Sequence, residues 1–175
     1  MVSMSILYII AKYITFPGAF LRCFWEQFMC KVQKVPIENN KCLQTNEMCG
    51  HIEHEMINGK VKSFFNAFIP GLIVFIFGFA CFIPAFVNLY MLDVTGTFNK
   101  IVMFVLLYLS ISMFTNIFPN VEDAMIMWES YKQLGIILKI VFFLGASIMY
   151  LGSYIEKYSI SFFTNAIIAA LIIIL

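Results

Sequence analysis

The chain has 175 residues, of which 62% are hydrophobic and 12% charged, and its formal net charge is +1. Soluble domains are about half apolar and about a quarter charged, so this composition excludes an ordinary water-soluble protein and indicates a lipid bilayer as the surroundings. The near-neutral charge, without a basic tail or stripe, argues against a nucleic-acid partner. We therefore expect an all-α integral membrane protein, a single domain over residues 1–175 with four to five transmembrane helices.

The first apolar stretch, at about residues 5–30, is long enough to cross a bilayer as one helix. It lacks a basic region followed by a small-residue cleavage site, so we expect it to be retained and not removed as a signal peptide. Within it, FPGAFLRCFWEQFMCK places Arg22 and Glu26 on one helix face. Two interpretations are open: a functional pair facing the interior of the bundle, or an ion pair at the membrane interface with Arg22 reaching the lipid headgroups.

A long polar segment follows at residues 31–62, where apolar residues alternate with polar ones. This pattern predicts a short β-hairpin, or a loop packed against the membrane face. The segment contains four candidate zinc ligands, Cys42, Cys49, His51 and His54. The two cysteines are separated by six residues, which is not the spacing of the usual structural zinc sites, so we expect no metal here and keep zinc as the alternative.

Three further spanning helices are expected at about residues 64–92, 100–118 and 133–154, and a shorter one at 159–175 that could span or be re-entrant. Prolines inside or near helix ends, Pro17, Pro70 and Pro84, predict kinks. The connections between these helices are short, and one of them, at about 119–130, contains FPNVEDAMIMW. Either Asn120 or Asp123 is expected to cap the N-terminus of the segment that follows.

Lysines predict the orientation of the helices. The polar segment holds Lys31, Lys34, Lys41, Lys60 and Lys62, and Lys132 ends the third connection. The second and fourth connections hold only Lys100 and Lys157. By the positive-inside rule, residues 31–62 face the cytoplasm and the N-terminus lies outside.

The five cysteines do not indicate a disulfide framework. Their number is odd, and Cys23, Cys30 and Cys81 lie in apolar segments, where cysteine behaves as a small hydrophobic residue.

Several pieces of the chain, in order, resemble a known family. FPG precedes the window RCFWE, the polar segment contains GHIEHE, SFFNAFIPGLIVFIFGF follows, and a later helix ends in FPNVEDAMIMW. Over about residues 10–130 this order is similar to compact prokaryotic integral-membrane zinc metalloproteases related to site-2 proteases. Those proteins place F-P-G before an H-E-x-x-H helix, then a hairpin with G-x-x-x-H, then a helix ending in F-P-x-x-x-D-A. The resemblance implies their fold and a prokaryotic cytoplasmic membrane.

The same resemblance argues against their activity. At the H-E-x-x-H positions, Arg22 replaces the first histidine, Cys23 the water-activating glutamate and Glu26 the second histidine. Arginine does not give up its proton to bind a metal. Asp123 matches the aspartate ligand of the family, and His51 or His54 could match the hairpin histidine. The resemblance therefore implies a degenerate site at Arg22, Cys23, Glu26 and Asp123, with no catalytic residue and no zinc.

These residues suggest that Arg22 takes the place of the zinc ion and bridges Glu26 with Asp123, because a guanidinium group can bond two carboxylates. We expect a non-catalytic membrane protein that binds a membrane segment, a peptide or a second copy of itself. One alternative is an oligomeric pore, transport or effector protein, favoured by Arg22, Glu26 and Lys139 at membrane depth. Another is an active metalloprotease with unusual ligands, Glu26 and Asp123 joined by a histidine of the hairpin.

Overall fold

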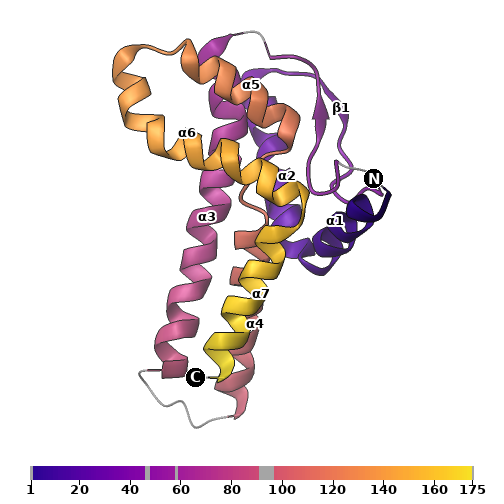
Figure 1. The fold of residues 1–175 in the computed structure, drawn as a ribbon, viewed down its shortest axis with the longest axis vertical. Helices are drawn as coiled ribbons and strands as arrows, with labels where there is room; N and C mark the ends of the chain where they lie inside the picture. Colours follow the sequence, from indigo (N-terminus) through magenta and orange to yellow (C-terminus); the bar gives the residue numbers. More distant parts are fainter. Residues whose placement is uncertain (1, 46–47, 58, 91–96, 175) are drawn as a thin grey trace.

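The computed structural model describes residues 2–45, 48–57, 59–90 and 97–174, which contain seven helices and one two-stranded sheet (Figure 1). Three of these helices are long and apolar enough to cross a membrane, or up to four if a bent pair at the N-terminus is one span. The chain is therefore mostly helical, with several helices suited to a bilayer, as the composition predicts.

The expected single helix at 5–30 is wrong. Helix α1 (Val2–Ile14) and helix α2 (Phe16–Gln33) meet at Thr15 with a bend of 92°. Pro17 lies in the first turn of α2 and has no N–H to bond the preceding turn, so a main-chain hydrogen bond that would join α1 and α2 into one helix is missing. The hydroxyl of Thr15 donates back to the Ala11 carbonyl at 2.8 Å, which closes the last turn of α1.

The polar segment forms the β-hairpin that its alternating pattern predicts. Strand β1 (Ile37–Asn39) pairs antiparallel with strand β2 (Glu53–His54), and Ile37 lies opposite His54. The chain between the two strands returns to α2, where residues on both sides of Gly50 are buried. The hairpin is therefore packed on the protein and is not a free surface loop.

Helices α3 (Lys60–Tyr90), α4 (Thr97–Thr115) and α7 (Ile160–Ile174) run along the long axis of the molecule (Figure 1). Helix α3 begins four residues earlier than expected, α4 ends three residues earlier, and α7 matches the short segment expected at 159–175. Residues 91 and 92, where the second expected helix was to end, lie outside the described residues.

The connection expected at 119–130 is instead a helix, α5 (Val121–Lys132), and α6 (Ile136–Lys157) follows it. The Asn120 side chain accepts a hydrogen bond from the Asp123 main-chain N–H at 2.7 Å, so of the two candidate caps Asn120 is the one used. Glu122 and Asp123 in the first turn add negative charge where the helix dipole favours it.

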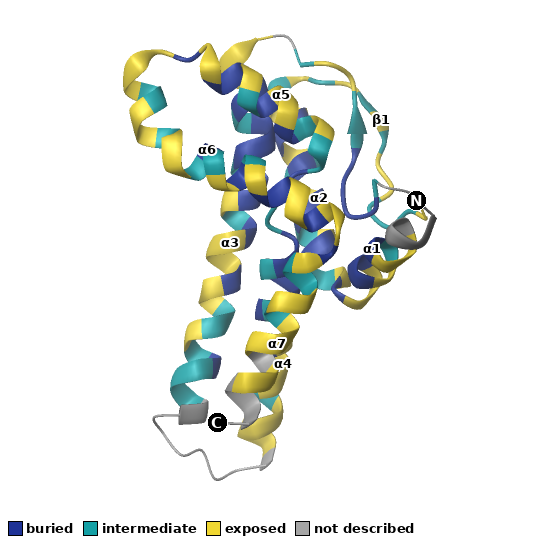
Figure 2. Cartoon of the chain, in the orientation of Figure 1, coloured by how far each residue is buried: buried dark blue, intermediate teal, exposed yellow. Residues whose placement is uncertain are grey.

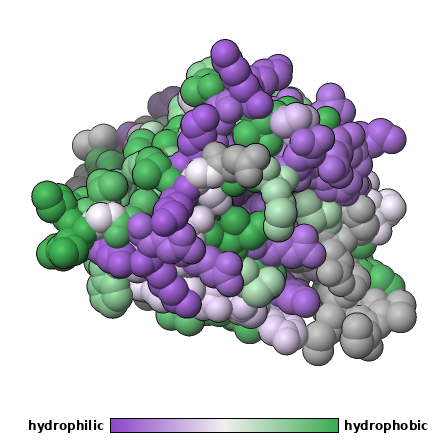
Figure 3. Space-filling view, turned by 90° about the horizontal axis from the view of Figure 1, so that it is seen from above, coloured by the Kyte–Doolittle hydropathy of each residue, from purple (hydrophilic) through white to green (hydrophobic). Residues whose placement is uncertain are grey.

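Buried residues are concentrated at the end of the molecule that holds α2, α5 and the hairpin (Figure 2). An apolar core cluster lies there, formed by Phe64, Ala67, Phe68, Met127, Tyr131, Leu134, Ala146 and Met149. Elsewhere large apolar side chains face outward, as on α4 at Phe98, 76% exposed, and Ile101, 57% exposed. Hydrophilic side chains gather on the end face above the hairpin and α5 (Figure 3).

Candidate functional site

Helix α2 directs Arg22 and Glu26 inward and its phenylalanines outward. Its buried face consists of Gly18, Ala19, Arg22, Cys23, Glu26, Met29 and Cys30. Its outer face exposes Phe16, Phe20, Phe24, Phe28 and Val32. Arg22 is 0% exposed, so the interpretation of Arg22 as an interfacial residue reaching the headgroups is wrong, and the pair faces the interior.

Arg22 connects α2 with the end of α4. Its Nε lies 2.8 Å from Glu26 Oε1, which confirms the ion pair predicted from the spacing. Its Nη1 also donates to the main-chain carbonyl of Asn116 at 3.3 Å and to that of Ile117. Carbonyls at a helix C-terminus have no partner within the helix, so a buried guanidinium satisfies groups that would otherwise be costly to bury.

The predicted bridge from Arg22 to Asp123 is wrong: among the described residues, Arg22 pairs with Glu26 and with carbonyls. The Asp123 carboxylate instead accepts a hydrogen bond from Asn120 Nδ2 at 2.9 Å and lies 3.7 Å from His54 Nε2. Burial, and then the charge of Glu26, raise the pKa of Asp123 above its usual range, while His54 acts in the opposite direction.

Glu26 also holds the hairpin. Its Oε1 lies 2.9 Å from His51 Nδ1, and its Oε2 accepts a hydrogen bond from the Ile52 main-chain N–H at 3.2 Å. His51 is fully buried. The sequence singled out both histidines of the hairpin, and the structure brings His51 into direct contact with the α2 pair. We call these three side chains the Arg22–Glu26–His51 cluster.

Two glycines allow the helices to converge on this cluster. A Cβ atom on Gly18 would lie 2.1 Å from the Ser112 carbonyl oxygen of α4, and one on Gly71 of α3 would lie 2.4 Å from the Ile117 carbonyl oxygen. Both positions therefore require glycine for close packing. The FPG motif thus combines a bend at Pro17 with a close helix contact at Gly18.

A second buried ion pair was missed in the sequence. Lys12 Nζ donates to Glu156 and, at 2.8 Å, to Asn116 Oδ1, and both charged residues are almost fully buried. Asn116 in turn donates to Thr15 Oγ1 at 3.0 Å. The available signal was a lone lysine in the apolar run YIIAKYI, because an ionisable residue in such a segment requires a partner.

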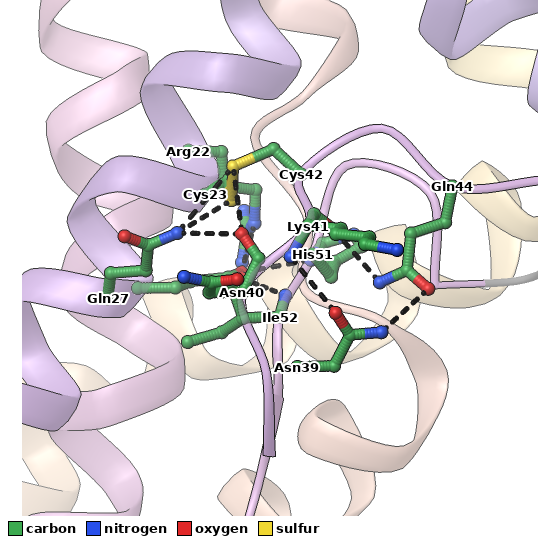
Figure 4. The surroundings of a disulfide bond; sticks show 11 residues. Arg22, Cys23, Gln27, Asn39, Asn40, Lys41, Cys42, Gln44, His51 and Ile52 are labelled. Atoms are coloured by element: carbon green, nitrogen blue, oxygen red, sulfur yellow. Dashed lines mark hydrogen bonds and ion pairs between the residues drawn. A yellow bond between two sulfur atoms is a disulfide. The ribbon is translucent and has the colours of Figure 1, made fainter. Parts of the chain in front are cut away.

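Cys23 and Cys42 form a disulfide, contrary to the expectation that Cys23 is a simple hydrophobic residue and that no disulfide is present (Figure 4). The bond joins the centre of α2 to the connection between the two strands, with the Cα atoms 5.6 Å apart. Cys30 is free and buried, as predicted. The Gln27 amide nitrogen lies 3.6 Å from Cys23 Sγ and 3.7 Å from Cys42 Sγ.

Three of the four candidate zinc ligands in the polar segment have other partners, and the fourth, Cys49, is a buried free thiol. Of the candidate ligands in the polar segment, Cys42 is in the disulfide, His51 is on Glu26 and His54 lies near Asp123. No group of three His, Cys, Asp or Glu side chains within the described ranges could hold a metal. On α2, both oxygens of Glu26 already accept hydrogen bonds, and Arg22, which keeps its proton, supplies a fixed positive charge.

Comparisons of the chain with protein-family models, with curated proteins and with solved structures find no match.

Proposed function

We propose that this chain is a non-catalytic integral membrane protein with a site-2-protease-like fold, from a prokaryotic cytoplasmic membrane, that binds a membrane segment of another protein. The observation that carries the proposal is the burial of Arg22 between Glu26 and the carbonyls at the end of α4. At the place where the resembling enzymes hold a metal and a water molecule, this chain has a cation paired with a carboxylate, which supports a structural role for the Arg22–Glu26–His51 cluster.

The outer face of α2 offers the binding surface. Phe16, Phe20, Phe24 and Phe28 follow one another at intervals of four residues along this face, and each is about half exposed. A pocket of about 360 Å³ adjoins this stripe and is lined by Phe20, Phe24, Gln27, Asn40, Cys42 and Leu43. Its apolar wall suits the side chains of a membrane helix, and its two amides supply hydrogen bonds for a polar end of that helix.

The proposed orientation puts the hairpin end in the cytoplasm, because most lysines lie on that end. If α1 and α2 together form one bent span, the N-terminus lies outside. The pore, transport and effector alternative stays a prediction. The metalloprotease alternative also stays a prediction: its candidate ligands pair as Glu26 with His51 and Asp123 with His54, but among the described residues no three of them form a group that could hold a metal.

Binding is tested by photocrosslinking in native membranes from a residue placed at Phe24, with the apolar and more exposed Ile137 as the control position. We expect Phe24 to give one discrete protein adduct that maps to an apolar segment, lost when Leu43→Arg adds charge to the pocket. Ile137 should give lipid adducts only. An adduct with a second copy of the chain would assign the surface to homo-oligomerisation, and lipid adducts at both positions would reject the binding proposal.

The non-catalytic part is tested by metal analysis of the purified chain. We expect less than one zinc per ten chains, and no cleavage of membrane peptides with added zinc. Stoichiometric zinc that is lost in Glu26→Gln but retained in the exposed control Glu122→Gln would overturn it.

A further inference from the structure

The two sulfur atoms of the disulfide differ in access. Cys23 is 0% exposed within α2, whereas Cys42 is half-buried and lines the pocket beside Phe20 and Phe24. Thiol–disulfide exchange proceeds by attack of a thiolate on one sulfur, and which sulfur is attacked depends on access. An incoming thiolate in the pocket therefore meets Cys42 Sγ and leaves Cys23 as the departing sulfur.

The surroundings of the bond favour its opening. The Gln27 side-chain amide, which also donates to the Asn40 carbonyl at 3.1 Å, lies within 3.7 Å of both sulfur atoms. When the bond breaks, one sulfur carries negative charge, and a nearby N–H donor stabilises that charge. Gln27 is positioned to do so for either sulfur.

The lysines indicate on which side of the membrane the disulfide lies, and therefore whether its surroundings are reducing or oxidising. Lys31, Lys34, Lys41, Lys60 and Lys62 flank or lie in the hairpin segment, which the positive-inside rule assigns to the cytoplasm. Cytoplasmic reductants keep thiols reduced, and disulfides found there are usually transient, either catalytic or redox-sensing. A disulfide on the lysine-rich end is thus expected to be transient and not a permanent crosslink.

We propose that Cys23–Cys42 is a reversible thiol–disulfide exchange site for cytoplasmic dithiol proteins, with Cys42 as the sulfur that they attack. This inference depends on the cytoplasmic position of the hairpin and not on the binding of a membrane segment. A partner thiolate forms a new S–S bond with Cys42, the Cys23–Cys42 bond breaks, and its electron pair leaves on Cys23, which takes up a proton. The second thiolate of the partner then attacks the partner's first cysteine sulfur in the mixed disulfide. Cys42 leaves as a thiolate and takes up a proton. The chain gains two thiols, and the partner dithiol is oxidised to a disulfide.

Reduction affects one wall of the pocket. Glu26 still holds His51 and Ile52, and the Tyr8 hydroxyl still donates to the Cys49 carbonyl at 3.1 Å. The segment at residues 40–44 loses its covalent attachment to α2. The pocket beside the phenylalanine stripe therefore opens on reduction, while the Arg22–Glu26–His51 cluster remains assembled.

The redox state is measured in cells that produce the full chain. Cells are quenched with acid, free thiols are blocked, disulfides are reduced, and the newly freed thiols are coupled to a maleimide polymer that adds mass. We expect no added polymer in untreated cells, two polymers per chain after brief exposure to a thiol oxidant, and reversal on recovery. Cys42→Ser should abolish the shift, and the matched control Cys81→Ser should retain it.

The attacked sulfur is identified with purified oxidised protein and a thioredoxin-type reductant whose second cysteine is replaced by serine. We expect a one-to-one mixed disulfide on Cys42, and severalfold faster tryptic cleavage after the exposed Lys41 on full reduction, with cleavage after Lys132 unchanged. Two polymers per chain under every condition, no polymer under any condition, or a mixed disulfide on Cys23 would each overturn the proposal. None of these results depends on the photocrosslinking test of partner binding.

Discussion

The guanidinium of Arg22 is surrounded by one carboxylate and two main-chain carbonyls, all inside the protein. A buried charge of this kind is tolerated only while its partners remain, because removal of one partner leaves the other charged and without water. Arg22 and Glu26 are therefore coupled: the cost of losing one depends on the presence of the other.

Replacing one member of the pair is expected to cost more than replacing both. Arg22→Met should lower the free energy of unfolding by about 3–5 kcal/mol, because it strands Glu26 in a buried site. The double variant Arg22→Met with Glu26→Gln should recover a large part of this loss, because the neutral amide removes the buried charge and its oxygen can still accept from the Ile52 N–H. Denaturant unfolding in detergent micelles measures the free energy of unfolding of the wild-type chain, the single variant and the double variant. Equal losses in the single and double variants would show that the pair is not coupled.

Asp123 gives a pH dependence whose sign follows from its raised pKa. A raised pKa means that the folded state binds the proton more tightly than the unfolded chain does. The resulting stabilisation is complete below the ordinary Asp pKa of 3.8 and is lost as the pH rises through the raised value.

Relative to Asp123→Asn, which has no carboxyl group to titrate, the wild-type chain should therefore lose stability as the pH rises from 3.8 through the raised pKa of Asp123. Melting temperatures measured from pH 3.5 upward test this difference. Glu129→Gln, an exposed acid of the same helix outside its first turn, serves as the control and should keep the wild-type difference from Asp123→Asn. A wild-type profile parallel to that of Asp123→Asn would contradict the assignment.

At the scale of helices, the contact between α2 and α4 depends on a missing side chain. The Gly18 N–H donates to the Ser112 hydroxyl at 2.8 Å, and the same hydroxyl donates to the Thr15 carbonyl at 2.9 Å. This approach brings the end of α4 within reach of Arg22. Helix contacts in membranes rely on small residues for this reason.

Gly18→Ala is expected to destabilise the chain by about 1–3 kcal/mol, because the added methyl group would overlap the Ser112 carbonyl. Gly135→Ala is the control, since a Cβ atom there has no neighbour within 4 Å. Unfolding in micelles compares the two variants. Equal free energies of unfolding for Gly18→Ala and Gly135→Ala would show that α2 and α4 can move slightly apart without loss of stability.

The local features were predictable from the sequence, and the long-range ones were not. The spacing of Arg22 and Glu26 defines a shared helix face, the alternation around Ile37 indicates a strand, and Asn120 after a proline indicates a cap. By contrast, Cys23 and Cys42 are separated by 19 residues across a helix end and a strand, so no periodicity relates them. The pairing of Arg22 with carbonyls was also hidden, because main-chain groups leave no mark in the sequence.

At the scale of the whole molecule, polar contacts link the cluster on α2 to the two ends of the chain. Asn116 accepts a hydrogen bond from Lys12 through its side chain and one from Arg22 through its carbonyl. The two buried ion pairs thus share one residue at the end of α4, and α1, α2, α4 and α6 meet there. Many large apolar side chains are exposed on the surface around them, which suits a bilayer.

The Lys12–Glu156 pair sets an order in which α1 and α6 reach their final positions during synthesis. The two residues are separated by 144 positions, so Lys12 leaves the ribosome long before its partner exists. Until α6 is synthesised, an ammonium group in an apolar segment has no carboxylate to neutralise it, and α1 cannot settle into its final place without a large cost. The α1 segment is therefore expected to wait at the membrane surface, and α1, although it is translated before α6, is fixed only after α6 is made.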